Sequence, residues 1–119
     1  MEIDIIKINN HNLALLKSYG ILIQETQDAL KIMAEASNLN SNKIILKEEQ
    51  ITPEFFDLKN GLAGEILQKF STYNVQLAII GDFSKYKSKN VRDFIFESNR
   101  YGRINFVRTL VEAQEKLSR

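Results

Sequence analysis

The sequence contains no cysteine, no tryptophan, one histidine, one proline and five glycines among its 119 residues. The absence of cysteine excludes disulfides, thiol nucleophiles and thiolate metal sites. With His11 as the single histidine, a Ser-His-Asp catalytic set could be built only through that residue. The low proline and glycine content argues against a disordered chain. We therefore expect one globular domain over residues 1–119.

Neither sign of charge prevails, because 16 lysines and arginines face 15 aspartates and glutamates, for a net charge of +1. This balance gives no overall field that would attract nucleic acid or an anionic membrane. The longest apolar run, residues 77–81 with its glycine included, is too short to span a bilayer. The first ten residues, MEIDIIKINN, lack the features of a secretory signal. We therefore expect a cytoplasmic location, and no motif indicates a cofactor.

Hydrophobic periodicity predicts the order of the secondary-structure elements. Two short apolar runs joined by turn-forming residues predict a β-hairpin at the start of the chain, over residues 2–8 and 13–18. Strand-like and helix-like segments then alternate. The predicted helices cover residues 26–36, 61–73, 88–102 and 109–117, and the remaining predicted strands cover residues 43–47, 75–83 and 104–108.

The resulting order, β-β-α-β-α-β-α-β-α, predicts an α/β fold with a mixed sheet. A sheet of about five strands, largely parallel and joined by right-handed crossovers, would carry about four helices, mainly on one side. The alternative is a flavodoxin-like doubly wound sheet, which would follow if the first hairpin were one strand and a loop.

The stretch FFDLKNGLAGEILQKF, residues 55–70, places two glycines where a helix should begin. Asn60 is a candidate capping residue. Backbone N–H groups at Gly61 and Gly64 could cradle an anion, but the Gly-Lys-Ser/Thr ending of a phosphate-binding loop is missing. The favoured interpretation is that Gly61 permits a turn and Gly64 lets the helix approach the sheet closely.

Two aspartates, Asp57 and Asp82, are candidates for a site at one edge of the sheet. Asp82 comes at the end of the most apolar strand, where side chains often line sites, and Asp57 could lie at the same edge of the sheet. Two adjacent carboxylates could bind Mg²⁺. Asp82 with Ser84 is also a good turn, in which the aspartate bonds its own backbone. We favour the turn and predict no metal site.

Basic and aromatic residues suggest a surface for a partner. Lys85 and its basic neighbours at 87, 89 and 92 surround Tyr86 at the start of the third helix, where they could meet a protein or a phosphate group. A solvated loop is the simpler interpretation. Of Phe55 and Phe56, one is expected in the core and the other could be an exposed anchor for a partner.

The predicted order of elements resembles that of STAS domains, the fold of the anti-sigma factor antagonists. These domains carry a signature, roughly Phe-x-Asp-Ser-Ser-Gly-Leu-Gly, after the third strand and at the start of the next helix. Here residues 55–64 read FFDLKNGLAG. Phe55 and Asp57 match the first part, and Gly61 and Leu62 match the Gly-Leu pair with one extra residue between. The resemblance implies a STAS-like fold.

Three segments are also similar to recurrent segments of a family of small bacterial proteins catalogued as domain of unknown function 4180. They are GLAGEILQKF, AIIGDFS and KSKNVRDFIFESNR, at residues 61–70, 78–84 and 87–100. The similarity extends over most of residues 43–117 and implies no established activity.

The residue at position 60 departs from the STAS signature. In the regulatory STAS proteins, the hydroxyl before the Gly-Leu pair belongs to the phosphorylated serine. Asn60 occupies the matching position here. An asparagine can cap a helix through its carbonyl oxygen, but it cannot take a phosphate. The resemblance therefore implies an interaction surface without this phosphorylation switch.

Three functions follow as hypotheses. The first is a non-enzymatic interaction or regulatory module, with an unknown protein partner and a homodimer through the N-terminal hairpin edge. The second is a sensor that holds an anionic or apolar small ligand at the N-terminus of the helix at 61–73. The third is an enzyme that uses Asp57 and Asp82. The residues assigned to interaction or ligand binding are Phe55, Asp57, Asn60, Gly61, Gly64, Asp82, Ser84 and Lys85.

Overall fold

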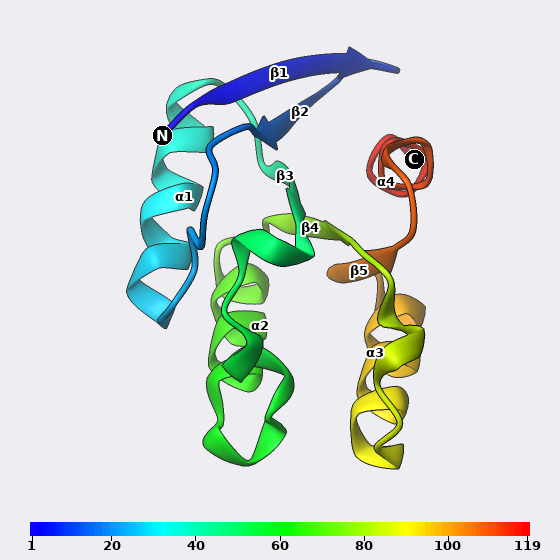
Figure 1. Cartoon of the computed structure of the whole chain (residues 1–119). Helices are drawn as coiled ribbons and strands as arrows, with labels where there is room; N and C mark the ends of the chain where they lie inside the picture. Colours follow the sequence, from blue (N-terminus) through cyan, green and yellow to red (C-terminus); the bar gives the residue numbers. More distant parts are fainter.

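A five-stranded sheet in the order β1-β2-β3-β4-β5 organises the chain in the computed structural model, which describes residues 1–119 (Figure 1). The strands are β1 (Ile3–Ile8), β2 (His11–Leu16), β3 (Lys43–Lys47), β4 (Gln76–Ile80) and β5 (Ile104–Val107). The helices are α1 (Thr26–Asn38), α2 (Leu62–Thr72), α3 (Lys89–Tyr101) and α4 (Leu110–Leu117). The predicted order and fold class are therefore confirmed.

An antiparallel hairpin opens the sheet. Strands β1 and β2 pair from Ile3↔Leu16 to Ile8↔His11. Asn9 and Asn10 make the two-residue turn with φ angles of 50° and 66°. Both values are left-handed, and the tight hairpin turn that matches the strand twist needs two such residues in a row. Asparagine tolerates this conformation better than most residues.

The three crossovers explain why most helices share one face. Strands β2, β3, β4 and β5 are parallel neighbours in chain order, so each crossover moves one strand in the same direction. Right-handed crossovers that keep one direction leave their helices on one face of the sheet. Accordingly α1, α2 and α3 lie in one layer, and α4 lies on the opposite side (Figure 1).

This strand order also corrects the alternative prediction. A doubly wound, flavodoxin-like sheet needs a point at which the direction of the strand order reverses. The sheet here runs from β1 to β5 without a reversal. The N-terminal segment also forms two strands rather than one strand and a loop, so the flavodoxin-like alternative is wrong.

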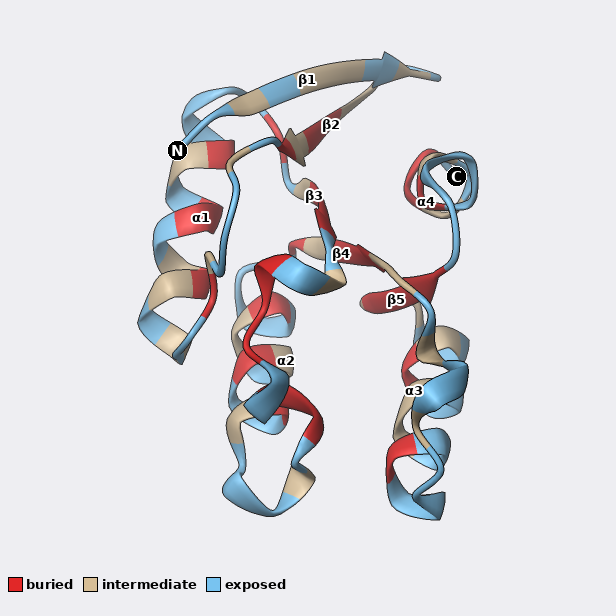
Figure 2. Ribbon diagram, viewed as in Figure 1, coloured by how far each residue is buried: buried red, intermediate tan, exposed pale blue.

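The two faces of the sheet bury cores of different size. The larger cluster lies under α1 to α3 and contains 21 buried residues, while the smaller one lies under α4 and contains six. Figure 2 shows the buried residues on the helix surfaces that face the sheet. On the α4 side Ile6, Ile8, Leu15 and Ile80 are only partly buried, because one short helix cannot cover five strands.

The predicted helix at 61–73 begins at Leu62 and ends at Thr72 in the structure. The chain before it forms short 3₁₀ turns at Pro53–Phe56 and Leu58–Asn60. None of the helices combines the length and the apolar character that crossing a lipid bilayer requires.

Candidate functional site

The segment that leads into α2, residues 53–61, is called the pre-helix segment. It follows β3 after a short 3₁₀ turn at Glu48–Gln50, and it starts with a capped turn. The Thr52 hydroxyl accepts a hydrogen bond from the Glu54 N–H at 3.4 Å, and Pro53 occupies the first position of the turn. Proline is favourable there because its fixed φ suits the turn and its missing N–H costs nothing.

Asn60, the last residue but one of the pre-helix segment, makes two side-chain hydrogen bonds. Its side-chain carbonyl accepts from the Leu62 N–H at 2.8 Å, and its side-chain NH₂ donates to the Glu54 carbonyl at 2.8 Å. Gly61 follows with a φ of 79°, in the left-handed region that glycine adopts without penalty. The prediction that Gly61 permits the turn is confirmed. Gly61 itself occupies the N-cap position of α2, and Asn60, one residue earlier, bonds the first N–H of the helix.

Gly64 does not have the predicted role. The buried positions of α2 are Ala63, Ile66 and Phe70. Gly64 is exposed, and a Cβ built on it would meet no atom within 4 Å. The prediction that Gly64 allows close approach to the sheet is wrong, because the helix turns about 100° per residue and carries Gly64 away from the face that Ala63 buries.

Both phenylalanines of the pre-helix segment are buried. Phe55 is 0% exposed and Phe56 is 6% exposed, so neither can be the exposed anchor for a partner. They belong to a cluster of six aromatic rings. The six are Phe55, Phe56, Phe83, Tyr86, Phe94 and Phe106.

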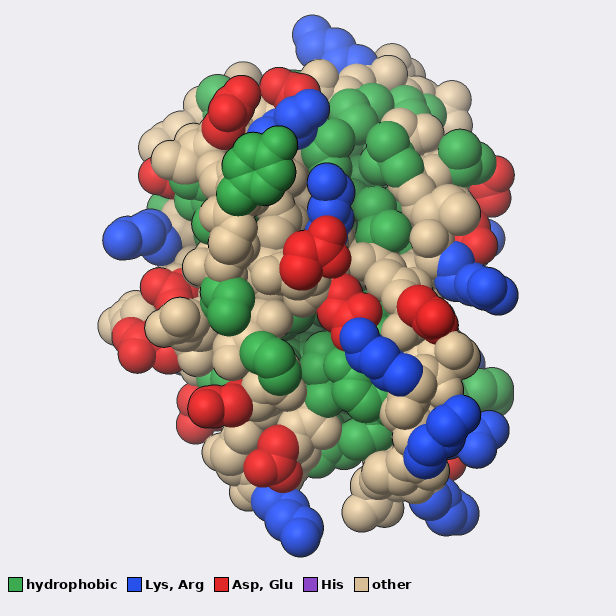
Figure 3. Space-filling model, in the orientation of Figure 1, with side chains coloured by type: hydrophobic (Ala, Val, Ile, Leu, Met, Phe, Trp, Pro, Cys, Tyr) green, Lys and Arg blue, Asp and Glu red, His purple; other side chains and the backbone are tan.

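The aromatic cluster joins the pre-helix segment to the loop after β4. The rings of Phe56 and Tyr86 stack with their centroids 4.5 Å apart, and Phe83 lies 5.9 Å from Phe56. Such pairs contribute about 0.5–1.5 kcal/mol beyond the burial of their area. Figure 3 shows hydrophobic side chains between the chain leading into α2 and α3 on the same face of the molecule. The two segments therefore lie side by side as expected, and contacts between aromatic rings hold them together.

Asp82 forms the turn that its sequence context predicts. Its carboxylate accepts from the Ser84 hydroxyl at 2.6 Å and from the Ser84 N–H at 3.1 Å. The hydroxyl bond, and then the N–H bond, lower the pKa of Asp82. Asp57 is exposed, and its side chain makes no hydrogen bond or ion pair. No group of three histidine, aspartate or glutamate side chains is arranged to hold a metal ion.

Glu48 is a residue of this edge that the sequence analysis missed. Its carboxylate bonds the Lys85 ammonium at 2.6 Å and accepts from the Tyr86 hydroxyl at 2.9 Å, and its side chain is only 14% exposed. Burial, followed by the bond to Glu48, raises the pKa of Tyr86. Glu48 directly follows β3, as Asp82 follows the glycine after β4. The position of an acid after a parallel strand was thus a usable signal.

Gly81 has the close contact that was expected of Gly64. A Cβ on Gly81 would lie 2.7 Å from Glu48 Oε1 and 2.8 Å from Glu48 Cβ. Glu48 can therefore cross the end of β4 and reach Lys85 and Tyr86 only because position 81 has no side chain. The contact holds the loop after β4 against the end of β3.

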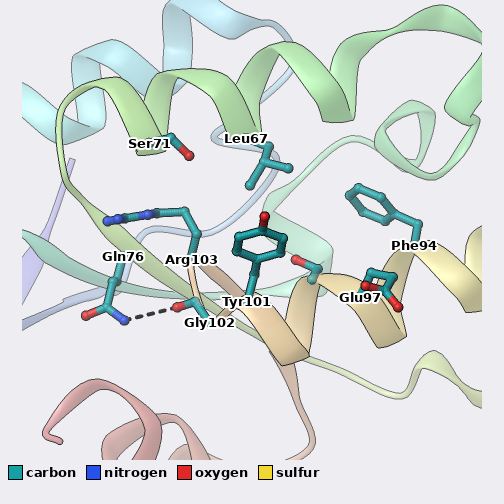
Figure 4. Close-up of a pocket in the computed structure, with 9 residues that line it drawn as sticks. Leu67, Ser71, Gln76, Phe94, Glu97, Tyr101, Gly102 and Arg103 are labelled. Carbon is teal, nitrogen blue, oxygen red and sulfur yellow. Dashed lines mark hydrogen bonds between the residues drawn. The ribbon is translucent and has the colours of Figure 1, made fainter.

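A cavity of about 590 Å³ lies between α2 and α3, at the amino ends of β4 and β5 (Figure 4). Its lining includes Leu67 and Ser71 from α2, Phe94 and Tyr101 from α3, and Arg103 before β5. No pattern in the sequence indicates this cavity, because its walls come from two separate crossovers.

The basic residues near the start of α3 do not form one cationic patch. Lys85 is paired with Glu48, and Lys89 is paired with Asp93 at 2.7 Å. Lys87 donates to the Ser84 carbonyl at 3.2 Å. All four residues are exposed, and Arg92 is the one whose side chain makes no hydrogen bond or ion pair. Local acids therefore pair with two of the four cations that the sequence concentrates here.

Comparisons with known proteins identify a family without a described activity. The family model described as "Domain of unknown function (DUF4180)" matches residues 8–117. No curated protein matches the chain. Among solved structures, a proposed anti-sigma factor antagonist from Thermotoga maritima is similar, with 16% identity and a TM-score of 0.48, over 98% of this chain and 95% of that one.

The first prediction concerns Asn60. Replacing Asn60 with alanine removes both of its hydrogen bonds, so Asn60→Ala should lower the free energy of unfolding by about 1 kcal/mol. Asn60→Ser keeps an oxygen that can accept from the Leu62 N–H but loses the amide bond to the Glu54 carbonyl, so it should cost less than Asn60→Ala. Urea denaturation of the parent and both variants measures the difference. Equal stability of Asn60→Ala and the parent would show that the cap contributes nothing.

The second prediction concerns the contact between Gly81 and Glu48. Gly81→Ala forces a methyl group into the Glu48 side chain and should cost about 1–3 kcal/mol, as overpacking does. Calorimetry or denaturant melts measure it. The matched control is Glu48→Gly, which removes the Cβ that the new methyl group would meet. In the double variant the two costs should not add; additive costs would show that Glu48 is not the obstacle.

Proposed function

We propose that this chain, which belongs to the DUF4180 family, is a non-enzymatic cytoplasmic module that binds a protein partner through a fixed docking surface. The docking surface comprises residues 57–64, which lead into and begin α2, and residues 82–86, which follow β4. It contains seven of the eight residues to which the sequence analysis assigned a binding role. Phe55 lies beneath it as a core residue.

The main support for this proposal is that Gly64 is a glycine in a helix although nothing in the chain requires one there. A glycine inside a helix costs about 1 kcal/mol relative to alanine. Gly64 lies in the first turn of α2, is exposed, and has open space where a Cβ would be. The packing of the chain on itself therefore gives no reason for a glycine. A reason exists if another molecule approaches the backbone of α2 closely, which glycine permits.

The rigidity of the two segments also supports a docking role. Asn60 holds one segment through two hydrogen bonds, and Asp82 and Glu48 hold the other through Ser84, Lys85 and Tyr86. The stacked rings of Phe56 and Tyr86 connect them. A surface that is already ordered pays less conformational entropy on binding than a flexible loop does.

The same contacts favour binding over catalysis. An enzyme of the kind first considered would need Asp57 and Asp82 to converge on a substrate with perturbed proton affinities. Asp82 is engaged by Ser84 within its own turn, in a way that stabilises its charged form. The position of the STAS phosphoserine holds Asn60, so this docking surface also lacks the hydroxyl that a phosphate switch would use there.

The third prediction tests Gly64. Gly64→Ala should raise the free energy of unfolding by about 1 kcal/mol, since alanine fits the open space and favours the helix. Gly64→Gln adds a long side chain to the docking surface and should abolish partner binding. The measurement is quantitative affinity purification of the tagged chain from its own cells, with Gln68→Ala, an exposed site one turn away, as the matched control.

Retention of the same proteins by the parent and Gly64→Gln would contradict the docking surface. Failure of the parent to retain any protein above a tag-only control would contradict the proposed function itself. Loss of binding in Gln68→Ala as well as in Gly64→Gln would show that the effect is not specific to position 64.

A homodimer is proposed separately, through the free edge of β1. The strand order leaves β1 at one side of the sheet, where unpaired N–H and C=O groups can bond a second copy. The Glu2 carbonyl accepts from the Lys17 N–H at 2.8 Å, which places the even-numbered residues of β1 in bonds with β2. The N–H of Lys7 therefore points away from β2.

The fourth prediction follows from this alternation. Light scattering at high protein concentration should give twice the 13.7 kDa mass of one chain. Lys7→Pro removes an outward N–H without breaking a bond to β2, so it should give the monomer mass with a native circular dichroism spectrum. A parent that stays at the monomer mass, or a Lys7→Pro variant that stays dimeric, would exclude this interface.

A further inference from the structure

The cavity between α2 and α3 lies at the opposite end of α2 from the docking surface. It is lined by Ser71 in the last turns of α2, Gln76 at the start of β4, and Tyr101 at the end of α3. Its volume of about 590 Å³ falls within the range of small-molecule sites, roughly 300–1,000 Å³. The cavity is large enough for a molecule of two or three fused or linked rings.

One wall of the cavity carries a cation without an acidic partner. The Arg103 guanidinium donates through a single nitrogen, to the Asn74 side-chain oxygen and to the Val75 carbonyl, both at 3.2 Å. It forms no ion pair. A guanidinium has five N–H donors, so those on the other two nitrogens are left to bind an anion.

A second cation stands beside Arg103. The Lys43 ammonium donates to the Gln76 side-chain oxygen at 2.6 Å, and the Gln76 NH₂ donates to the Gly102 carbonyl at 3.0 Å. Burial, and then repulsion by Arg103, lower the pKa of Lys43. The amino edge of the sheet thus holds two cations with only neutral partners. An anion bound here would relieve their mutual repulsion.

The other wall is apolar. Leu67 from α2 and Phe94 from α3 are half-buried and face the cavity from opposite helices (Figure 4). Tyr101 is 88% exposed at the rim, so its ring has little packing against the chain itself. Glu97 also lines the cavity, and Arg100 lies 3.7 Å from its carboxylate. Figure 4 shows Glu97 on the Phe94 side, away from Arg103.

We propose that this cavity binds a small apolar molecule that carries a single anionic group, such as an aromatic carboxylate or sulfonate. The anionic group lies against Arg103, the apolar body lies between Leu67 and Phe94, and the ring of Tyr101 covers it. Glu97 opposes a second negative charge at the other end of the ligand. This site is distinct from the docking surface. The proposed small ligand therefore binds beside the C-terminal half of α2 and not at its N-terminus.

The probe for the experiment is 8-anilinonaphthalene-1-sulfonate, an aromatic monoanion whose fluorescence rises in an apolar site. Titration of the folded parent should show saturable binding with one site per chain. Arg103→Gln should weaken this binding at least tenfold. Arg92→Gln removes the same charge at an exposed position outside the cavity, and it should change the affinity less than twofold.

Arg103 also bonds Asn74 and Val75, so a second pair of variants tests the site without changing its charge. Ser71→Trp places an indole in the cavity wall and should weaken binding at least tenfold. Thr72→Trp places the same indole on the neighbouring exposed residue, outside the cavity lining, and should leave binding unchanged. The neutral probe N-phenyl-1-naphthylamine should bind more weakly than the sulfonate, and Arg103→Gln should not affect it.

Three results would overturn the proposal. They are the absence of saturable binding of the sulfonate by the folded parent, equal effects of Arg103→Gln and Arg92→Gln, and unchanged binding by Ser71→Trp. None of them bears on the docking surface, which the Gly64 variants test by a different measurement.

Discussion

The handedness of the three crossovers is the constraint on which the rest of this structure depends. Each crossover adds the next strand on the same side of the previous one, and right-handed connections then place α1, α2 and α3 on one face. That face receives the larger core, and the other face is left to α4. The unequal covering of the sheet therefore follows from strand order rather than from the composition of any single strand.

Parallel strands also end at the same edge of the sheet, so the loops that follow them lie close together. The chain leaves β3 and β4 at the same edge, so the pre-helix segment and the loop after β4 become neighbours although about thirty residues of sequence separate their aromatic rings. Stacking of Phe56 on Tyr86 and the bonds of Glu48 to Lys85 and Tyr86 then hold the two together. The glycine at position 81 makes these bonds possible, since any side chain there would meet Glu48.

The two ends of α2 have different chemistry. Its N-terminal turn has an exposed glycine and follows the segment that carries Phe55 and Phe56. Its C-terminal half forms one wall of a cavity that has an apolar side and a guanidinium without an acidic partner. Because α2 is packed on the sheet through Ala63, Ile66 and Phe70, one helix contributes to both the proposed docking surface and the proposed ligand site.

Interactions between residues close in the chain allowed much of this fold to be predicted from the sequence. The two periodicities of apolar residues defined the order of strands and helices, and an asparagine followed by a glycine marked the start of α2, because capping and left-handed turns depend on residues adjacent in the chain. Contacts between distant segments were decided by the tertiary structure alone. Gly64 and Gly81 look alike in the sequence, but only the fold places Glu48 beside one and open solvent beside the other. Phe55 and Phe56 both become buried because rings from three other segments meet them, and Arg103 becomes a cavity wall because two crossovers end beside it. These assignments depend on where the sheet brings separate strands together, which no single stretch of sequence encodes.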